Sequence, residues 1–167
     1  VPGVQYDIVV TPKMSFGTGH HATTFMMVEA MKSLDMPGKK VLDFGTGTGI
    51  LAILAEKMGA NSVKAIDNDS WSIDNAGENI GRNNCRIIQL ELAETLVGEE
   101  KYDVILANIN KHVILEQLPL MVKHAARYGV ILISGLLQSD GDDLNRAIAP
   151  HNLTLFNQSE RQSWLCW

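Results

Sequence analysis

The sequence predicts an α/β protein whose mostly parallel sheet is covered by helices on both faces. Short apolar runs of strand length alternate with helical patterns in five successive units, as expected for parallel strands joined by crossover helices. A glycine-rich turn joins the first of these strands to its helix. Two apolar runs close the chain in quick succession, so we expect a hairpin in which one strand runs antiparallel to the rest.

The amino-terminal part is expected to contribute one short strand and one helix before the first full unit. Gln5–Thr11 predicts a strand that Pro12 ends. An apolar stripe at helical spacing predicts a helix from about Thr23 to Leu34. Its N-cap is expected to be Thr23 or Thr24.

The remaining elements follow in regular alternation. Strands are predicted at 41–44, 63–67, 85–90, 102–107 and 128–134, with closing strands at 153–157 and 163–166. Helices are predicted from 50 to about 58, 71 to 83, 110 to about 126, and 139 to 149. The 71–83 helix should turn Ile73, Ala76 and Ile80 inward. Pro119 should kink or interrupt its helix, and Trp164 and Trp167 are expected to be packing residues.

The composition is that of a single globular domain. The chain has 167 residues, of which 46% are hydrophobic and 20% charged, enough for a substantial core. Its net charge of −5 argues against a broad nucleic-acid-binding surface. The two cysteines, Cys85 and Cys166, are far apart in sequence and make neither a disulfide framework nor a metal cluster, and no apolar run reaches membrane-spanning length. We therefore expect a cytoplasmic protein without a bound metal.

The glycine turn is the predicted ligand site. It follows the strand Val41–Phe44, carries Gly45, Gly47 and Gly49 in alternation with threonines, and leads directly into a helix. Glycine tolerates positive φ and lets a ligand approach the backbone. The helix start adds unpaired N–H groups and a partial positive charge. The alternative is a glycine turn without a ligand, which is common in α/β folds.

The spacing of this turn favours S-adenosylmethionine (SAM) over a dinucleotide. Dinucleotide sites usually have Gly-x-Gly-x-x-Gly, and the third glycine of that pattern would fall on Ile50. Asp43 lies two residues before the first glycine. An acid there would repel phosphates, whereas it would favour the sulfonium and ammonium groups of SAM.

Two other strand ends carry polar candidates. Asp67 follows the first glycine by 22 residues, close to the place where an acid binds ribose hydroxyls. Asn108 and Asn110 follow the fourth core strand, at the edge where parallel sheets bind ligands. Helix capping is the alternative at both ends, by Asp69 or Ser70 at the first and by Asn110 at the second.

The stretch Ser15–Thr24 is a further candidate. It holds two glycines, two histidines and three threonines just ahead of a helix. One interpretation is a loop that folds over a ligand, with Gly17 and Gly19 allowing it to bend. The alternative is a capped helix start in which His21 is only a solvated or hydrogen-bonded loop residue.

Five motifs cover most of the chain: FGTGHHATT at Phe16–Thr24, VLDFGTGTGILAI at Val41–Ile53, AIDNDSWSIDNAGEN at Ala65–Asn79, ANIN at Ala107–Asn110 and SGLL at Ser134–Leu137. Together they resemble the ribosomal protein L11 methyltransferases, the PrmA family. The first motif is similar to that family's F-G-T-G-x-H-x-T-T signature and is particular to it. The other four are shared more widely among SAM methyltransferases.

The resemblance implies the seven-stranded class I SAM-dependent methyltransferase (Rossmann-like) fold. It also implies SAM as cofactor and S-adenosylhomocysteine as product. Carried over position by position, it implies cofactor contacts from Thr24, Gly45, Asp67 and Asn108. Further cofactor contacts are expected from residues of the same loops: Phe16, Thr18, His21, Gly47 and Asn68. Asn108 is also the expected catalytic residue, which would accept hydrogens from the substrate amine and aim its lone pair at the methyl group.

The resemblance further implies a substrate. The family methylates lysine side chains and the N-terminal α-amine of a ribosomal protein, so L11 is the expected partner, with no membrane and no direct nucleic-acid binding. The chain begins at Val1 without an initiator methionine, and nothing in it can be the family's N-terminal substrate-recruiting domain. Residues 1–167 are therefore expected to be the catalytic domain, with 1–22 leading into the loop over the cofactor.

One segment departs from the family. Many members have Gly-Asp-Ala after the third strand, where this chain has Glu91-Leu92-Ala93. The acid that often contacts the adenine amino group is therefore displaced or absent. Glu91, Glu94 or the backbone are the alternatives for that contact.

Three rival functions follow from the sequence. A methyltransferase of nucleic acid or of a small molecule is one, and the acidic balance disfavours nucleic acid. A dinucleotide oxidoreductase is another, and Asp43 and the glycine spacing argue against it. The third is a SAM-binding module without activity. Thr24, Asp67 and Asn108 argue against this module, whereas the altered third strand and the missing recruiting domain favour it.

Overall fold

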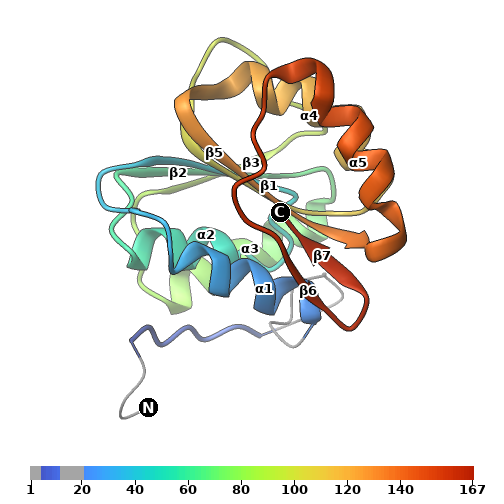
Figure 1. The fold of residues 1–167 in the computed structure, drawn as a ribbon. Coiled ribbons are helices and arrows are strands. Elements are labelled where there is room, and N and C mark those ends of the chain that lie inside the picture. The colour runs from blue at the N-terminus through green and yellow to red at the C-terminus, as the bar shows by residue number, and fades with distance from the viewer. Residues whose placement is uncertain (1–4, 12–20) are drawn as a thin grey trace.

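The protein, in a computed structural model that describes residues 5–11 and 21–167, has the predicted α/β architecture (Figure 1). The described residues form one sheet in the order β3-β2-β1-β4-β5-β7-β6. Its strands are β1 Lys40–Phe44, β2 Ser62–Asp67, β3 Ile88–Leu92, β4 Tyr102–Asn108, β5 Ala125–Leu137, β6 Ser159–Arg161 and β7 Trp164–Cys166. Neighbours from β3 to β5 pair in parallel, whereas β7 is antiparallel to β5 and β6. The expected seven-stranded class with an antiparallel last strand is confirmed.

Helices cover both faces of this sheet. They are α1 Ala22–Met31, α2 Ile50–Lys57, α3 Ser70–Arg82, α4 Lys111–His124 and α5 Gly141–Ile148, and the short 3-10 helices Gln138–Asp140 and Ala149–His151 flank α5. Figure 1 shows α1, α2 and α3 on one face and α4 and α5 on the other. Within the described part of the chain, no helix is both long enough and apolar enough to span a membrane.

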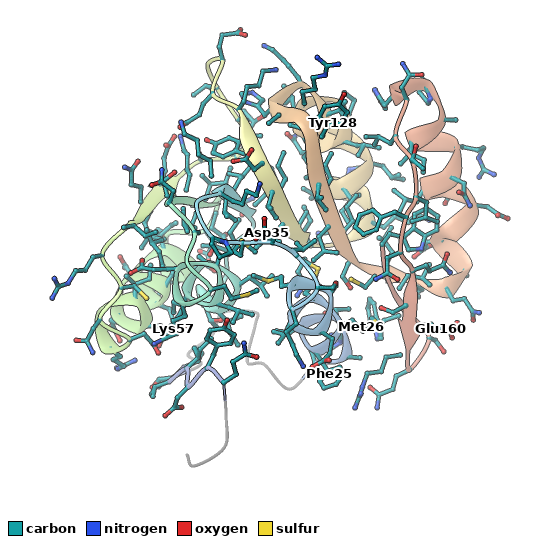
Figure 2. The ribbon with its side chains drawn as sticks, turned by 60° about the vertical axis from the view of Figure 1, so that its left-hand side comes forward. Phe25, Met26, Asp35, Lys57, Tyr128 and Glu160 are labelled. Atoms are coloured by element: carbon teal, nitrogen blue, oxygen red, sulfur yellow. The ribbon has the colours of Figure 1, made fainter. Side chains whose placement is uncertain are left out.

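The core consists of two layers that meet at the central strands. Val41–Phe44 of β1 is buried throughout, as expected for a strand with helices on both faces. On one side α1 contributes a group of buried methionines, Met26, Met27 and Met31. Met26 is buried, whereas its neighbour Phe25 is partly exposed, and both are labelled in Figure 2. On the other side α4 and α5 pack against β5 through Ile114, Leu118, Leu144 and Ile133.

Residues 5–11 are extended, but the strand predicted there is wrong. The backbone N–H and C=O groups of Val9 and Thr11 are hydrogen-bonded to asparagine side chains of α3 and its C-cap. These side chains satisfy the polar groups that a neighbouring strand would otherwise pair. The segment therefore lies along a helix rather than in the sheet.

Helix α3 is buried differently from the prediction. Ala76 is fully buried as expected, but Ile73 and Ile80 are only half-buried. The other buried positions are polar: Ser72, Asn75 and Asn79. This polar face is explained by the extended segment that it binds, because buried amides need hydrogen-bond partners.

Other elements also differ from expectation. The strand predicted at 153–157 is wrong, because β6 forms at Ser159–Arg161 and makes the expected hairpin with β7. The third core strand lies at Ile88–Leu92 rather than 85–90. Pro119 does not interrupt α4, which continues to His124. Pro119 is exposed, so water can solvate the carbonyl group that the proline leaves without a donor.

Candidate functional site

A cavity of about 460 Å³ opens beside the carboxyl ends of β1, β2 and β4. Its volume is in the range of small-ligand sites, and it lies where the sheet order reverses between β1 and β4. The lining includes six of the expected site residues: His21, Gly45, Gly47, Asp67, Asn68 and Asn108. Three strand ends and the start of α1 thus bring together these six residues, which are far apart in sequence.

Among the described residues, one expected site residue, Thr24, does not line the cavity. Thr24 is buried in the first turn of α1 and is hydrogen-bonded to Asn108, which does line it. Phe16 and Thr18 lie outside the described residues, as does the loop expected to cover the cofactor.

The glycine turn starts with a close approach between two strands. Gly45 has a φ of +75°, and its N–H donates to the Ile66 carbonyl at 2.9 Å. A Cβ at this position would overlap Ile109 Cγ2. Glycine is therefore required at position 45 both for its backbone conformation and for the side chain that packs on it.

Asp43 is part of the wall behind the turn and does not line the cavity. Its carboxylate accepts hydrogen bonds from Thr46 Oγ1 at 2.6 Å and from the Ala52 N–H at 3.2 Å. The pKa of Asp43 is raised to about 6, chiefly because the carboxyl group is buried. The two hydrogen bonds lower this pKa, whereas the nearby Asp67 carboxylate raises it. The expectation that Asp43 faces a ligand cation is wrong, since its partners are the turn and α2.

Asp67 is the acid that faces the cavity. One carboxylate oxygen accepts the Gly47 N–H at 2.9 Å and the other accepts the Asp69 N–H at 3.1 Å. A carboxylate has about four acceptor positions, so two remain for a ligand. Asp69 is the N-cap of α3, as expected, and accepts from Trp71 and Ser72 N–H groups.

Asn108 lines the cavity at the end of β4, and strand β1 separates it from the end of β2 that carries Asp67. Its Nδ2 donates to Thr24 Oγ1 at 3.3 Å. This contact fixes the side-chain amide and leaves its Oδ1 as an acceptor. Asn110 caps α4 by accepting the Val113 N–H at 3.1 Å, which confirms the expected capping role.

His21, rather than Thr23 or Thr24, is the N-cap of α1. Its Nδ1 accepts from the Thr23 N–H and lies 2.8 Å from Thr23 Oγ1. The ring packs edge-on against Trp164 with 5.0 Å between centroids. Trp164 also lines the cavity, whereas the sequence indicated only a packing role for it.

The acids considered for adenine are separated by the structure. Glu91 forms an ion pair with Lys64 at 2.7 Å and is not part of the cavity wall. Glu94 lines the cavity next to Ala93, whose N–H donates to the Asp67 carbonyl at 2.9 Å. Of the two acids, Glu94 is therefore the one that lines the cavity.

Gly135 determines where Ile109 and the end of β4 lie. It has a φ of +98°, and a Cβ there would overlap the Ile109 carbonyl. The Ile109 N–H donates to the Ser134 carbonyl at 3.2 Å. The sequence marked Gly135 only as part of a motif, because its close contact comes from a residue 26 positions earlier.

A protein-family model described as "Ribosomal protein L11 methyltransferase (PrmA)" matches residues 4–167. Among curated relatives, the ribosomal protein L11 methyltransferase of Chlorobaculum tepidum is 44% identical over 98% of this chain. That of Porphyromonas gingivalis is 39% identical over 98% of it. The chain spans 58% and 57% of the lengths of these two relatives.

Solved structures agree on the fold. A ribosomal protein L11 methylase from Lactobacillus delbrueckii subsp. bulgaricus superposes with a TM-score of 0.81 at 30% identity, over 91% of this chain and 78% of that one. The 16S rRNA N2 G1207 methyltransferase of T. thermophilus, solved with AdoMet and guanosine, gives 0.76 at 19% identity over 91% and 44%. The second comparison shows a shared fold alone.

Gly135→Ala should destabilise the protein by more than about 2 kcal/mol, because backbone strain and overlap with Ile109 act together. Gly98→Ala is the matched control, since Gly98 has a φ of +88° and no atom lies within 4 Å of the place that a Cβ would take. It should cost only the strain, about 1 kcal/mol. Urea unfolding of both variants measures the difference, and equal losses would contradict the role of Ile109.

Asp43→Asn should change how stability depends on pH. The folded-state pKa of about 6 exceeds the ordinary 3.8, so Asp43 stabilises the fold at low pH and loses this contribution as pH rises towards 6 and beyond. The stability of the wild type relative to Asp43→Asn should fall by on the order of 3 kcal/mol between pH 4 and pH 7. Chemical unfolding across this range tests it, and a pH-independent difference would rule the effect out.

Proposed function

The chain belongs to the ribosomal protein L11 methyltransferase (PrmA) family, and from this premise we propose that it is the catalytic part of a SAM-dependent N-methyltransferase. Its proposed substrates are lysine side chains and the N-terminal α-amine of a ribosomal protein, L11 itself. The chain spans 57% of the length of curated relatives. The proposal therefore concerns the chemistry of this portion.

The charge of the cavity supports SAM as the cofactor. Asp67, Asp69 and Glu94 line it, and its described lining contains no lysine or arginine. A dinucleotide pyrophosphate would be repelled by this set, whereas a sulfonium and an α-ammonium would be attracted. The free acceptor positions of Asp67 suit a ribose hydroxyl pair, and Glu94 would accept from the adenine amino group.

The position of Asn108 is the observation that carries the proposal. The hydroxyl of Thr24 holds the Nδ2 of Asn108, and the Oδ1 of Asn108 remains available in the cavity lining. An oxygen acceptor there can take one N–H of an amine and direct the nitrogen lone pair towards the cofactor side. Such alignment is the main contribution a protein can make to an in-line transfer.

The reaction needs no oxyanion hole. Bound SAM supplies a sulfonium methyl, so the amine forms a nitrogen–carbon bond as the carbon–sulfur bond breaks and sulfur leaves neutral. The nitrogen then loses a proton to solvent. What the chain must do is align the amine and exclude water, because charge is dispersed as the methyl moves.

The amine must arrive without its proton. A free lysine has a pKa near ~10.4, so roughly one in a thousand is neutral at pH 7.4, whereas an α-amine near ~7.7–8.0 is far readier. A partly apolar wall disfavours the ammonium form and lowers its pKa. Phe44, Ile109 and Trp164 provide that wall.

Asn108→Ala should lower kcat by about a hundredfold, because the amine loses its alignment, while SAM still binds. Thr24→Val removes the hydroxyl group that holds Asn108 and should give a smaller loss in kcat. Thr24→Ser keeps that group and is the matched control. Steady-state methyl transfer with calorimetric SAM titration measures both effects, and unchanged turnover in Asn108→Ala would exclude the proposed role.

The proposal as a whole predicts transfer of labelled methyl from SAM to isolated ribosomal protein L11 by this 167-residue chain. Calorimetry with SAM runs in parallel, with NAD as the control ligand. Transfer would show that this portion finds its substrate unaided. SAM binding without transfer would assign recruitment to another part of the protein or another substrate to the site, and NAD binding without SAM binding would overturn the proposal.

A further inference from the structure

Residues 5–11, here called the strap, are fastened to α3 by three asparagines. Asn75, Asn79 and Asn83 are spaced four apart, so they form one column along the helix and its C-cap. All three are buried, with 1%, 0% and 9% of their surface exposed. A buried column of amides is costly unless each amide has partners.

The strap provides these partners at alternate residues. Asn83 binds both backbone groups of Val9, accepting from its N–H at 2.9 Å and donating to its carbonyl at 2.7 Å. Asn79 Oδ1 accepts the Thr11 N–H at 3.0 Å, and Asn75 Nδ2 donates to the Thr11 carbonyl at 3.0 Å. The column thus replaces a neighbouring strand.

Asn79 also reaches the glycine turn. Its Nδ2 donates to the carbonyl of Thr48 at 2.9 Å. Thr48 lies between Gly47, whose N–H binds Asp67, and Gly49, which is the N-cap of α2. One buried amide therefore joins the strap to the turn that borders the cavity.

We propose that Asn79 is a positioning residue that couples the glycine turn to the strap, so that SAM binding at the turn tightens the strap on α3. This rests on the proposed function, since SAM is its effector. Asn79 holds the Thr48 carbonyl in place, and a turn fixed by its ligand holds the Asn79 amide in return. Such coupling is reciprocal, because the strap must favour SAM binding by the same factor as SAM favours the strap.

Asn83 is the comparison residue, because its role in the strap is purely structural. It is buried in the same column and binds the strap through two hydrogen bonds, and its third is to the Asn79 carbonyl. It makes no hydrogen bond to the turn. Replacing Asn83 should loosen the strap, whereas replacing Asn79 should loosen the strap and disturb the turn.

The test combines SAM calorimetry with amide hydrogen exchange by NMR. In the wild type, saturating SAM should slow exchange of the Val9 amide by several-fold. In Asn79→Ala, the Kd for SAM should rise about tenfold, and SAM should no longer affect the Val9 amide, although Asn83 still binds it. In Asn83→Ala, the strap should exchange faster, but the Kd should stay within about twofold.

Asn79→Asp keeps the test interpretable if the alanine variant does not fold. A carboxylate still accepts from the Thr11 N–H but cannot donate to Thr48. Its strap should remain protected while its Kd for SAM rises, which a general loss of packing would not produce. Equal Kd values for the wild type, Asn79→Ala and Asn79→Asp would overturn the coupling alone. No SAM binding by the wild type would overturn the proposed function together with the coupling.

Discussion

The site depends on one buried carboxylate. Asp43 lies one residue before the end of the buried strand β1 and accepts hydrogen bonds from Thr46 in the turn and Ala52 in α2. Strand, turn and helix are thereby held in one arrangement. Burying a carboxylate is costly, and its raised pKa measures that cost. The cost is offset because the N–H group in the first turn of α2 and the threonine hydroxyl need an acceptor.

A second constraint places Asn108 beside the cavity. Ile109 packs its side chain on Gly45 and its backbone on Gly135, and both contacts leave no room for a Cβ. The ends of β1, β4 and β5 are therefore closer together than ordinary side chains would allow. The neighbouring residue, Asn108, is presented to the cavity by this packing and oriented by Thr24. Two glycines from separate motifs thus determine the position of one amide.

Helix α3 links this arrangement to the amino-terminal strap. Its buried face is polar, which would be unfavourable against a sheet but is satisfied by the backbone of Val9 and Thr11. Asn79 extends the same network to the Thr48 carbonyl. The hydrogen-bond network therefore runs from the strap, through α3, to the glycine turn that borders the cavity. A continuous network of this kind is the physical basis on which occupancy of one end can affect the other.

The sequence by itself determined the alternation of strands and helices, the glycine turn and the polar residues at strand ends. These are local patterns: apolar periodicity, glycine spacing and capping residues depend on neighbours within a few positions. The cavity-lining positions of Gly45, Gly47, Asp67 and Asn108 follow from them, because carboxyl ends of parallel strands share one edge.

Only the tertiary structure decided which partners these residues have. Gln5–Thr11 has the pattern of an extended chain, but that pattern cannot distinguish a neighbouring strand from a column of asparagines on a helix. Asp43 was expected to face a ligand, and Trp164 to serve only in packing; the structure turns Asp43 to α2 and places Trp164 on the cavity wall. In each case the deciding contact joins segments distant in sequence. Local patterns specify a residue's conformation and polarity, whereas its partner is chosen by the packing of the whole chain.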